Sequence, residues 1–132
     1  MNQIRHYRGW SIIWHEWVYG WYVYNGEESL IYPLSNGLSQ VVDPESVGQS
    51  TGLKDCNGKE IYEGDIIKNE LFVYLVQWRN DFAVWYAKCK YIGRETDYES
   101  GNLGLKIHNY KSQVIGNQFE NPELLEDNND NQ

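Results

Sequence analysis

The chain has 132 residues and a formal net charge of −8, with 19 acidic against 11 basic side chains. This length fits one domain of ordinary size and is too short for two independent enzymatic domains. The acidic balance disfavours non-specific binding to duplex nucleic acid, because an acidic body repels the phosphate backbone at long range.

The number of cysteines and the hydropathy of the sequence predict the compartment in which the protein is found. The only two cysteines, Cys56 and Cys89, are far apart and form neither a metal-ligand pair nor a redox pair. We therefore expect free thiols in a reducing compartment, with Cys56 exposed beside a turn and Cys89 in the core. No stretch approaches the ~20 apolar residues that span a bilayer, and the N-terminus lacks the apolar run of a signal peptide. These features predict a soluble, intracellular protein.

The N-terminal part is rich in aromatic residues and is predicted to form a β-hairpin. Residues 17–24 (WVYGWYVY) and 30–34 (LIYPL) are strand-like runs, separated by a polar segment that begins with Asn25–Gly26. Asn-Gly is a strong hairpin-turn signal, and aromatic side chains favour the half-buried surfaces of strands. Pro33 lacks a backbone donor, so the second strand is expected to lie at an edge or to end there.

Residues 42–67 (VDPESVGQSTGLKDCNGKEIYEGDII) combine several turn and strand signals. Asp43–Pro44 predicts an ordered turn instead of a long strand. Asn57–Gly58 predicts a two-residue turn with positive φ at both positions. This turn would place Lys54–Asp55 opposite Lys59–Glu60 in a small hairpin, with the charges facing water.

The second half contains further strand and loop predictions. Residues 71–78 and 82–91 are predicted antiparallel strands joined by a tight connection at 79–81. Alternate positions of the second run form its expected core face: Ala83, Trp85, Ala87, Cys89 and Tyr91. Residues 92–104 mix charges with glycines and carry no period, which predicts a surface loop. Residues 106–117 return to a strand-like pattern.

The C-terminal residues predict a short helical turn followed by a disordered acidic tail. Asn121 can cap a helix start, and Pro122 suits the first helical position. Glu123 lies near the positive end of this helix, and Leu124–Leu125 supply the apolar contact. The tail at 127–132 has no apolar residue to bury.

Two segments resemble the sequence pattern of a known family. Residues 42–67, together with 114–126 (VIGNQFENPELLE), resemble the signature of the YopX-like family of phage and prophage proteins. Residues 8–10 and 17–21 are a looser match to the N-terminal segment of that family. The resemblance implies a phage or prophage accessory protein in the cytoplasm of a bacterial host. It also implies a single domain over residues 1–126, without an assigned biochemical activity.

The fold is predicted from the aromatic-rich composition and from a second resemblance, to SH3-like barrels. Within residues 60–67, Ile61 would anchor in the core, Gly64 would let the chain bend and Ile66 would lead into the next strand, as at the start of SH3-like barrels. The expected fold class is mainly β, either all-β or α+β with little helix. It comprises an N-terminal aromatic hairpin region (1–49), a small SH3-like barrel (50–126) and the short C-terminal helical turn.

No motif in the sequence indicates enzymatic chemistry. Glu60, Glu63 and Asp65 could offer oxygen ligands to a divalent cation, but they lack the further ligands of a recognised loop. The three histidines lack the spacing of metal ligands: His6, His15 and His108. The sequence contains neither a nucleophile elbow nor a phosphate-binding loop with its lysine. We therefore expect a non-enzymatic protein without a catalytic, metal or cofactor site.

The aromatic N-terminal segment is the strongest candidate for a functional surface. Trp and Tyr concentrate binding energy in protein interfaces, and a core of this size cannot enclose all six Trp and eleven Tyr side chains. The candidate interaction residues are Trp14, Trp17, Tyr19 and Trp21. They predict a homo-oligomer, or a complex with a host or phage protein. The competing interpretation is that these rings are core and edge packing of a sheet.

A nucleic-acid-associated regulatory role is the alternative. Aromatic rows stack on single-stranded bases when a basic groove accompanies them. The basic residues available for such contacts are Arg5, Arg8, Lys88, Lys90 and Arg94. A third possibility is that the acidic chain mimics nucleic acid and binds a basic host protein.

Overall fold

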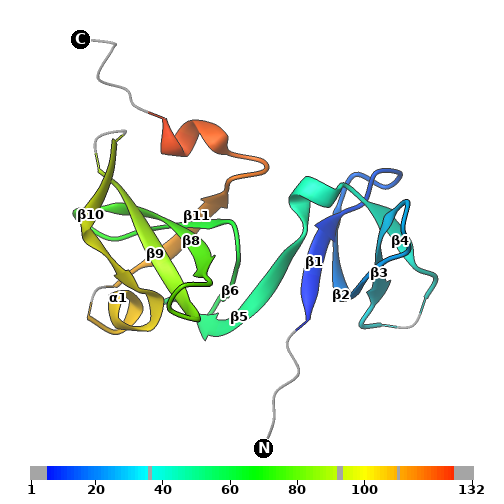
Figure 1. The fold of residues 1–132 in the computed structure, drawn as a ribbon, viewed down its shortest axis with the longest axis horizontal. Coiled ribbons are helices and arrows are strands. Elements are labelled where there is room, and N and C mark those ends of the chain that lie inside the picture. The colour runs from blue at the N-terminus through cyan, green and yellow to red at the C-terminus, as the bar shows by residue number, and fades with distance from the viewer. Residues whose placement is uncertain (1–5, 36, 92–93, 110, 127–132) are drawn as a thin grey trace, which may run out of the picture. The chain divides into compact units, whose positions relative to one another are not determined.

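The computed structural model describes residues 6–35, 37–91, 94–109 and 111–126, and their side chains except at 90–91, 94–99, 105 and 108–109. Contacts divide the chain into two compact units, Met1–Gly52 and Leu53–Gln132. Both units consist mainly of antiparallel strands (Figure 1). The predicted mainly β fold class is therefore confirmed.

The first unit contains the predicted aromatic hairpin. Its elements are β1 (Tyr7–Trp10), β2 (Trp17–Tyr24), β3 (Ser29–Pro33), β4 (Gln40–Val42), the 3₁₀ helix η1 (Pro44–Ser46) and the start of β5 (Gly48–Lys54). The strands lie in the order β4-β3-β2-β1-β5. β2 and β3 pair around a turn in which the Asn25 N–H donates to the Glu28 carbonyl at 3.2 Å. The predicted hairpin and its end at Pro33 are both confirmed.

The apolar interior of the first unit lies on one face of this sheet. Ile31 on β3 and Val42 on β4 are buried there. On the same face the rings of Tyr7 and Tyr22 are 5.5 Å apart between centroids. Side chains from alternate positions of a strand share a face, so the intervening residues of β2 and β3 are left on the opposite face.

The turn predicted at Asp43–Pro44 is present as η1. The Asp43 Oδ1 atom accepts a hydrogen bond from the Glu45 N–H at 2.9 Å. Ser46 then ties this turn to β1, because its Oγ accepts from the Trp10 N–H at 2.7 Å and donates to the Asp43 carbonyl at 2.6 Å. These bonds satisfy backbone groups that the short helix leaves open.

The second unit contains most of the remaining strands. Its elements are β6 (Glu60–Tyr62), β7 (Asp65–Lys68), β8 (Val73–Arg79), β9 (Val84–Tyr91), β10 (Arg94–Asn102), the helix α1 (Leu103–Asn109), β11 (Gln113–Asn117) and the 3₁₀ helix η2 (Pro122–Leu125). Five of the strands form a sheet in the order β10-β9-β8-β7-β11. Within the described residues this sheet is open and not closed into a barrel, so the prediction of a small SH3-like barrel is wrong in that respect.

The core of the second unit confirms most of the predicted inward face. Its buried members are Ile61, Ile67, Tyr74, Val76, Trp85, Ala87, Cys89 and Leu103. Ile61 anchors the core as expected, and three of the predicted positions on β9 are buried (Trp85, Ala87 and Cys89). Ala83 is an exception, because it is exposed and precedes β9 with a positive φ of 52°. The Tyr91 side chain lies outside the described side chains.

Two segments differ from their sequence-based assignment. The predicted loop at 92–104 contains β10, which pairs with β9 from Arg94 opposite Tyr91 to Asn102 opposite Tyr86. The segment forms a strand because it pairs with β9, although its sequence lacks the alternation of apolar residues that is typical of strands.

The predicted strand at 106–117 begins with α1 and only its last part is β11. The helix forms because Leu103 and Ile107, four residues apart, both pack against the core.

The hairpin at Asn57–Gly58 is present, with two differences from the prediction. Only Gly58 has a positive φ, of 84°, whereas Asn57 does not. Asp55 does not face water, since its side chain is only 7% exposed. Its Oδ1 accepts from the N–H groups of Asn57 and Lys59, each at 2.9 Å. A carboxylate can be buried when backbone donors replace the water that it loses.

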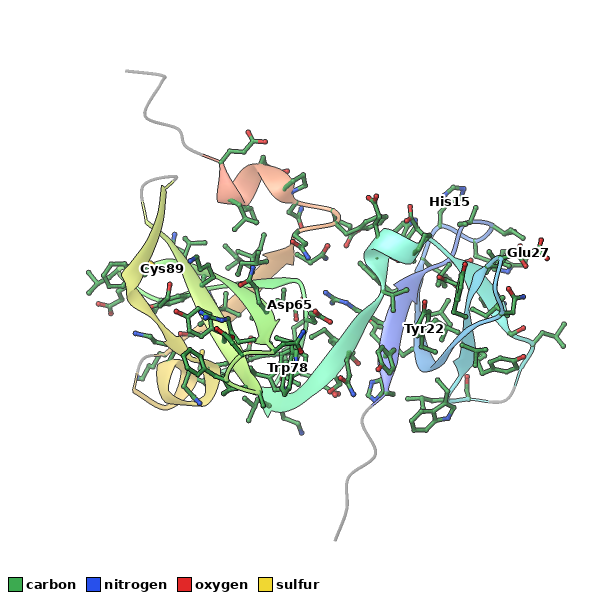
Figure 2. All side chains as sticks on the ribbon, in the orientation of Figure 1. His15, Tyr22, Glu27, Asp65, Trp78 and Cys89 are labelled. Atoms are coloured by element: carbon green, nitrogen blue, oxygen red, sulfur yellow. The ribbon has the colours of Figure 1, made fainter. Side chains whose placement is uncertain are left out.

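The bend predicted at Gly64 is confirmed. Gly64 has a φ of 92°, which favours glycine, and its N–H donates to the Val76 carbonyl at 2.9 Å. The next residue, Asp65, lies inside the second unit, as Cys89 does (Figure 2). The Asp65 Oδ2 atom accepts from the Tyr62 N–H at 2.8 Å and so fixes the turn between β6 and β7.

The predicted C-terminal helical turn is present as η2, which begins at Pro122. The predicted capping role of Asn121 is wrong, because its side chain makes no cap hydrogen bond. Its Oδ1 atom instead accepts from the Asn117 N–H at 3.2 Å, at the end of β11. The predicted disordered tail at 127–132 lies outside the described residues.

Candidate interaction surface

One face of the first sheet exposes a row of large apolar side chains. Alternate residues of β2 lie on this face: Trp17, Tyr19, Trp21 and Val23. Tyr19 and Trp21 are each 41% exposed, and Val23 is also exposed. The opposite face carries Tyr22, which packs towards the interior with Tyr7. Three of the four predicted interaction residues therefore share one open face.

The strand register adds two residues that the sequence analysis did not select. Trp21 lies directly opposite Tyr32 on β3, which is 46% exposed. The Leu34 N–H donates to the Tyr19 carbonyl at 2.9 Å, which places exposed Leu34 beside Tyr19. The predicted hairpin contained the signal, since directly opposed residues share a face. We call this set the aromatic face: Trp17, Tyr19, Trp21, Val23, Tyr32 and Leu34.

One end of the aromatic face is held by packing within the unit. The rings of Trp10 and Trp17 are 5.4 Å apart between centroids, in an edge-to-face arrangement at 81°. The Arg8 guanidinium lies over the Trp17 ring, with Cζ 4.5 Å from the centroid. Such contacts restrict the rotation of an indole and make its position definite. Trp17 is therefore half-buried, while the middle of the face stays open.

Trp14 lies in the loop before β2 and not on the strand. Ser11 is buried and organises this loop: its N–H donates to the Glu16 carbonyl at 2.8 Å and its Oγ accepts from the Trp14 N–H at 3.0 Å. His15, labelled in Figure 2, has a positive φ of 55° and donates its N–H to the Ser11 carbonyl at 3.0 Å. The ordered loop exposes Ile12, Ile13 and Trp14, the last by 65%.

A shallow hollow adjoins the aromatic face at Tyr19 and Leu34. Its volume is about 410 Å³, and its other lining residues are Glu16, Val18, Pro33, Ser35 and Gln40. Glu16 is the only charged residue among them. The hollow is mostly apolar and is of a size that admits a side chain of another protein.

Of the basic residues predicted for nucleic-acid contacts, the structure describes the side chains of Arg8 and Lys88, which belong to different units. Arg8 belongs to the first unit, is only 7% exposed and lies against Trp17. Lys88 belongs to β9 of the second unit and is half-buried. Arg5 lies outside the described residues, and the side chains of Lys90 and Arg94 lie outside the described side chains.

The carboxyl groups with displaced pKa values have structural explanations. Burial acts to raise the pKa of Asp55, but hydrogen bonds from the amides of Val114, Lys59 and Asn57, with the Lys59 charge, outweigh it and lower the pKa below its ordinary value. The hydrogen bond from the Arg79 guanidinium lowers the pKa of exposed Asp81. Neither carboxyl belongs to a cluster of candidate ligands, since the described residues contain no group of three His, Cys, Asp or Glu able to hold a metal.

The two thiols match their predicted positions, with Cys56 exposed and Cys89 buried, and neither of them forms a disulfide bond. A separate exposed cluster was not predicted, at the end of the β8–β9 hairpin. There the Arg79 Cζ lies 5.1 Å from the Phe82 ring centroid and 4.7 Å from that of Tyr86.

Among the described residues, no helix has both the length and the apolar character needed to cross a membrane.

Comparison with known sequences identifies one family. The family model described as YopX protein matches residues 6–126. The match extends over both units, from the strands of the aromatic face to η2. No curated protein matches the chain.

Proposed function

Because the chain belongs to the YopX protein family, we propose that it is a non-enzymatic accessory protein encoded by a phage or prophage, which acts by self-association through the aromatic face. One observation carries this proposal. Tyr19, Trp21 and Tyr32 lie together on one face of a sheet and are each more than two-fifths exposed. The site of action proposed is the cytoplasm of the bacterial host.

The composition of the aromatic face favours a protein partner. Contiguous apolar patches on soluble proteins mark binding sites, and Trp and Tyr are the residues most enriched among binding hot spots. Both rings also combine a large apolar area with a polar tip, so they tolerate water in the free protein. Trp21 and Tyr32, which oppose each other across β2 and β3, are expected to contribute most.

The uncharged side chains of the aromatic face favour a second copy of the chain as the partner, although the net charge does not. Each copy carries a net charge of −8, which opposes approach at long range. None of the six members of the aromatic face is an Asp, Glu, Lys, Arg or His, so the contact between two copies is made by uncharged side chains. A two-fold contact requires a surface that is complementary to itself, and an uncharged aromatic row meets that requirement.

Sedimentation velocity over a concentration series tests the proposal. We compare the natural protein with Trp21→Ser, Tyr32→Ser and the matched control Phe82→Ser, which removes an exposed ring of the second unit. Loss of a hot spot costs about 2 kcal/mol or more, so each of the first two variants should weaken association about 30-fold. Phe82→Ser should leave it unchanged. Circular dichroism confirms that each variant folds.

Two results would contradict the proposal. The first is a natural protein that stays monomeric at every concentration. The second is dissociation by Phe82→Ser to the same extent as by Trp21→Ser, which would move the contact away from the aromatic face. A monomer that captures a basic protein would instead favour the nucleic-acid mimic.

A further inference from the structure

The turn between β2 and β3 is closed in part by an Asn side chain that accepts hydrogen bonds from the backbone. The Asn25 Oδ1 atom accepts two backbone hydrogen bonds, from Glu27 N–H at 2.9 Å and from Glu28 N–H at 2.7 Å. The following residue is Gly26, which is exposed and has open space around its Cα. Within the described residues, neither the Asn25 Nδ2 nor the Gly26 N–H has a hydrogen-bond acceptor.

This geometry has a chemical consequence for the Asn25–Gly26 peptide. The backbone nitrogen of a residue after Asn can attack the side-chain Cγ, and a glycine offers the least steric hindrance to that attack. Negative charge develops on Oδ1 as the new bond forms. Two N–H donors already aimed at Oδ1 stabilise that charge, as the donors of an oxyanion hole do. We infer that Asn25 is a site of spontaneous deamidation in the folded protein.

The reaction is balanced without an oxidant or a metal. The Gly26 nitrogen loses its proton to solvent hydroxide and forms a bond to Asn25 Cγ. The bond from Cγ to Nδ2 then breaks, and ammonia leaves with a proton from water. Water next opens the resulting succinimide at either carbonyl. The products are aspartate, or isoaspartate with one additional backbone atom.

The Asn57–Gly58 peptide offers an internal comparison, because it has the same two residue types in an exposed turn. There the attacking Gly58 N–H is bound to the Asp55 carbonyl at 3.0 Å. The leaving Nδ2 of Asn57 is bound to Gln113 Oε1 at 3.1 Å. In the described structure the Asn57 Oδ1 has no backbone donor. All three differences make Asn57 the slower site.

Modification of Asn25 would alter the hairpin that carries the aromatic face. Aspartate keeps the acceptor oxygen but adds a negative charge beside Glu27 and Glu28. Isoaspartate lengthens the backbone and disrupts the turn closed by the Asn25 N–H and the Glu28 carbonyl. The inference does not depend on self-association, because it concerns the turn alone.

Peptide mapping by mass spectrometry tests the inference on the intact folded protein. The protein is incubated near neutral pH, and the conversion of Asn25 and Asn57 is followed with time. Asn57 must first release the two hydrogen bonds of its Nδ2 and of the Gly58 N–H, so we expect it to react at least about tenfold more slowly than Asn25. Gln113→Ala removes one of these bonds and should accelerate Asn57 without changing Asn25.

Incubation in concentrated urea provides the control, because an unfolded chain retains only the local sequence. The two sites should then react at similar rates. Conversion of Asn25 that is no faster than that of Asn57 in the folded protein would overturn the inference. If Asn25 reacted faster than Asn57 by the same factor in urea as in the folded protein, the inference would also be overturned, because the preference would then not come from the fold.

Discussion

The Asp55 Oδ2 atom accepts a hydrogen bond from the Val114 N–H at 2.9 Å, although the two residues are 59 positions apart. Two neighbouring contacts join the same segments: Cys56 N–H donates to the Ser112 carbonyl at 3.0 Å, and Asn57 Nδ2 donates to Gln113. The carboxylate thus satisfies a backbone donor on β11, the last strand of its sheet. Unpaired edge donors invite association with other chains. The two segments that resemble the family signature are therefore hydrogen-bonded to each other within the second unit.

Asp55→Asn should destabilise the protein by about 2–3 kcal/mol, because the charged acceptor of three backbone amides is lost. An amide offers only one acceptor oxygen, and its NH₂ group would face a backbone donor. Urea denaturation measures the loss. Asp81→Asn makes the same chemical change at an exposed carboxyl and should cost far less. Equal losses from the two variants would contradict this role of Asp55.

The lowered pKa of Asp55 predicts a pH dependence of stability. Its pKa is lower in the folded than in the unfolded protein, so on acidification the unfolded state takes up the proton first. The stabilising contribution is complete above the ordinary aspartate pKa and is lost as the pH falls through the folded value. Denaturation curves at several acidic pH values measure the free energy of unfolding of the natural protein and of Asp55→Asn. The difference between the two free energies should become smaller as the pH falls. A difference that is constant with pH would contradict the prediction.

Ala83→Gly should stabilise the protein. Ala83 has a φ of 52°, where a Cβ atom costs about 1 kcal/mol that glycine avoids. The midpoint of thermal unfolding should rise. Ala87→Gly is the matched control, because Ala87 is buried in the extended strand β9, where glycine only loses packing and chain entropy. A fall in the midpoint for Ala83→Gly would show that the left-handed conformation is not strained.

Ser112→Ala should be neutral or stabilising by up to about 1 kcal/mol, because a buried hydroxyl without a partner in the described structure is removed. Ser46→Ala should cost about 1–2 kcal/mol, since that buried Oγ bonds both Trp10 and Asp43. Chemical denaturation of the two variants provides the comparison. A larger loss for Ser112→Ala than for Ser46→Ala would contradict it.

Local signals in the sequence predicted local structure well. Asn25–Gly26 between two aromatic runs located the first hairpin, and alternation along 82–91 located the buried Trp85, Ala87 and Cys89. Trp17, Tyr19 and Trp21 were selected as aromatic residues of a predicted strand, and in β2 they occupy alternate positions and share a face. These features depend on neighbouring residues in one or two strands, which the order of residues already specifies.

Features that depend on distant contacts were missed. Asp55 was expected to face water because nothing near it in sequence indicates Val114 as its donor. β10 lacks an apolar period, and its pairing with β9 supplies the order that its composition does not. The sheet of the second unit is open because of the order in which its strands pair. The barrel was predicted from a resemblance of residues 60–67 alone, and so short a segment does not specify that order. Tyr32 joined the aromatic face only through the register with Trp21.

Light scattering during size-exclusion chromatography at low salt tests the central claim of self-association most directly. The natural protein is run alone and with a single-stranded oligonucleotide, beside Trp21→Ser. The account predicts a discrete oligomer whose mass is unchanged by the oligonucleotide and falls in Trp21→Ser. A monomer that gains mass with the oligonucleotide would contradict it and would favour binding through the basic residues.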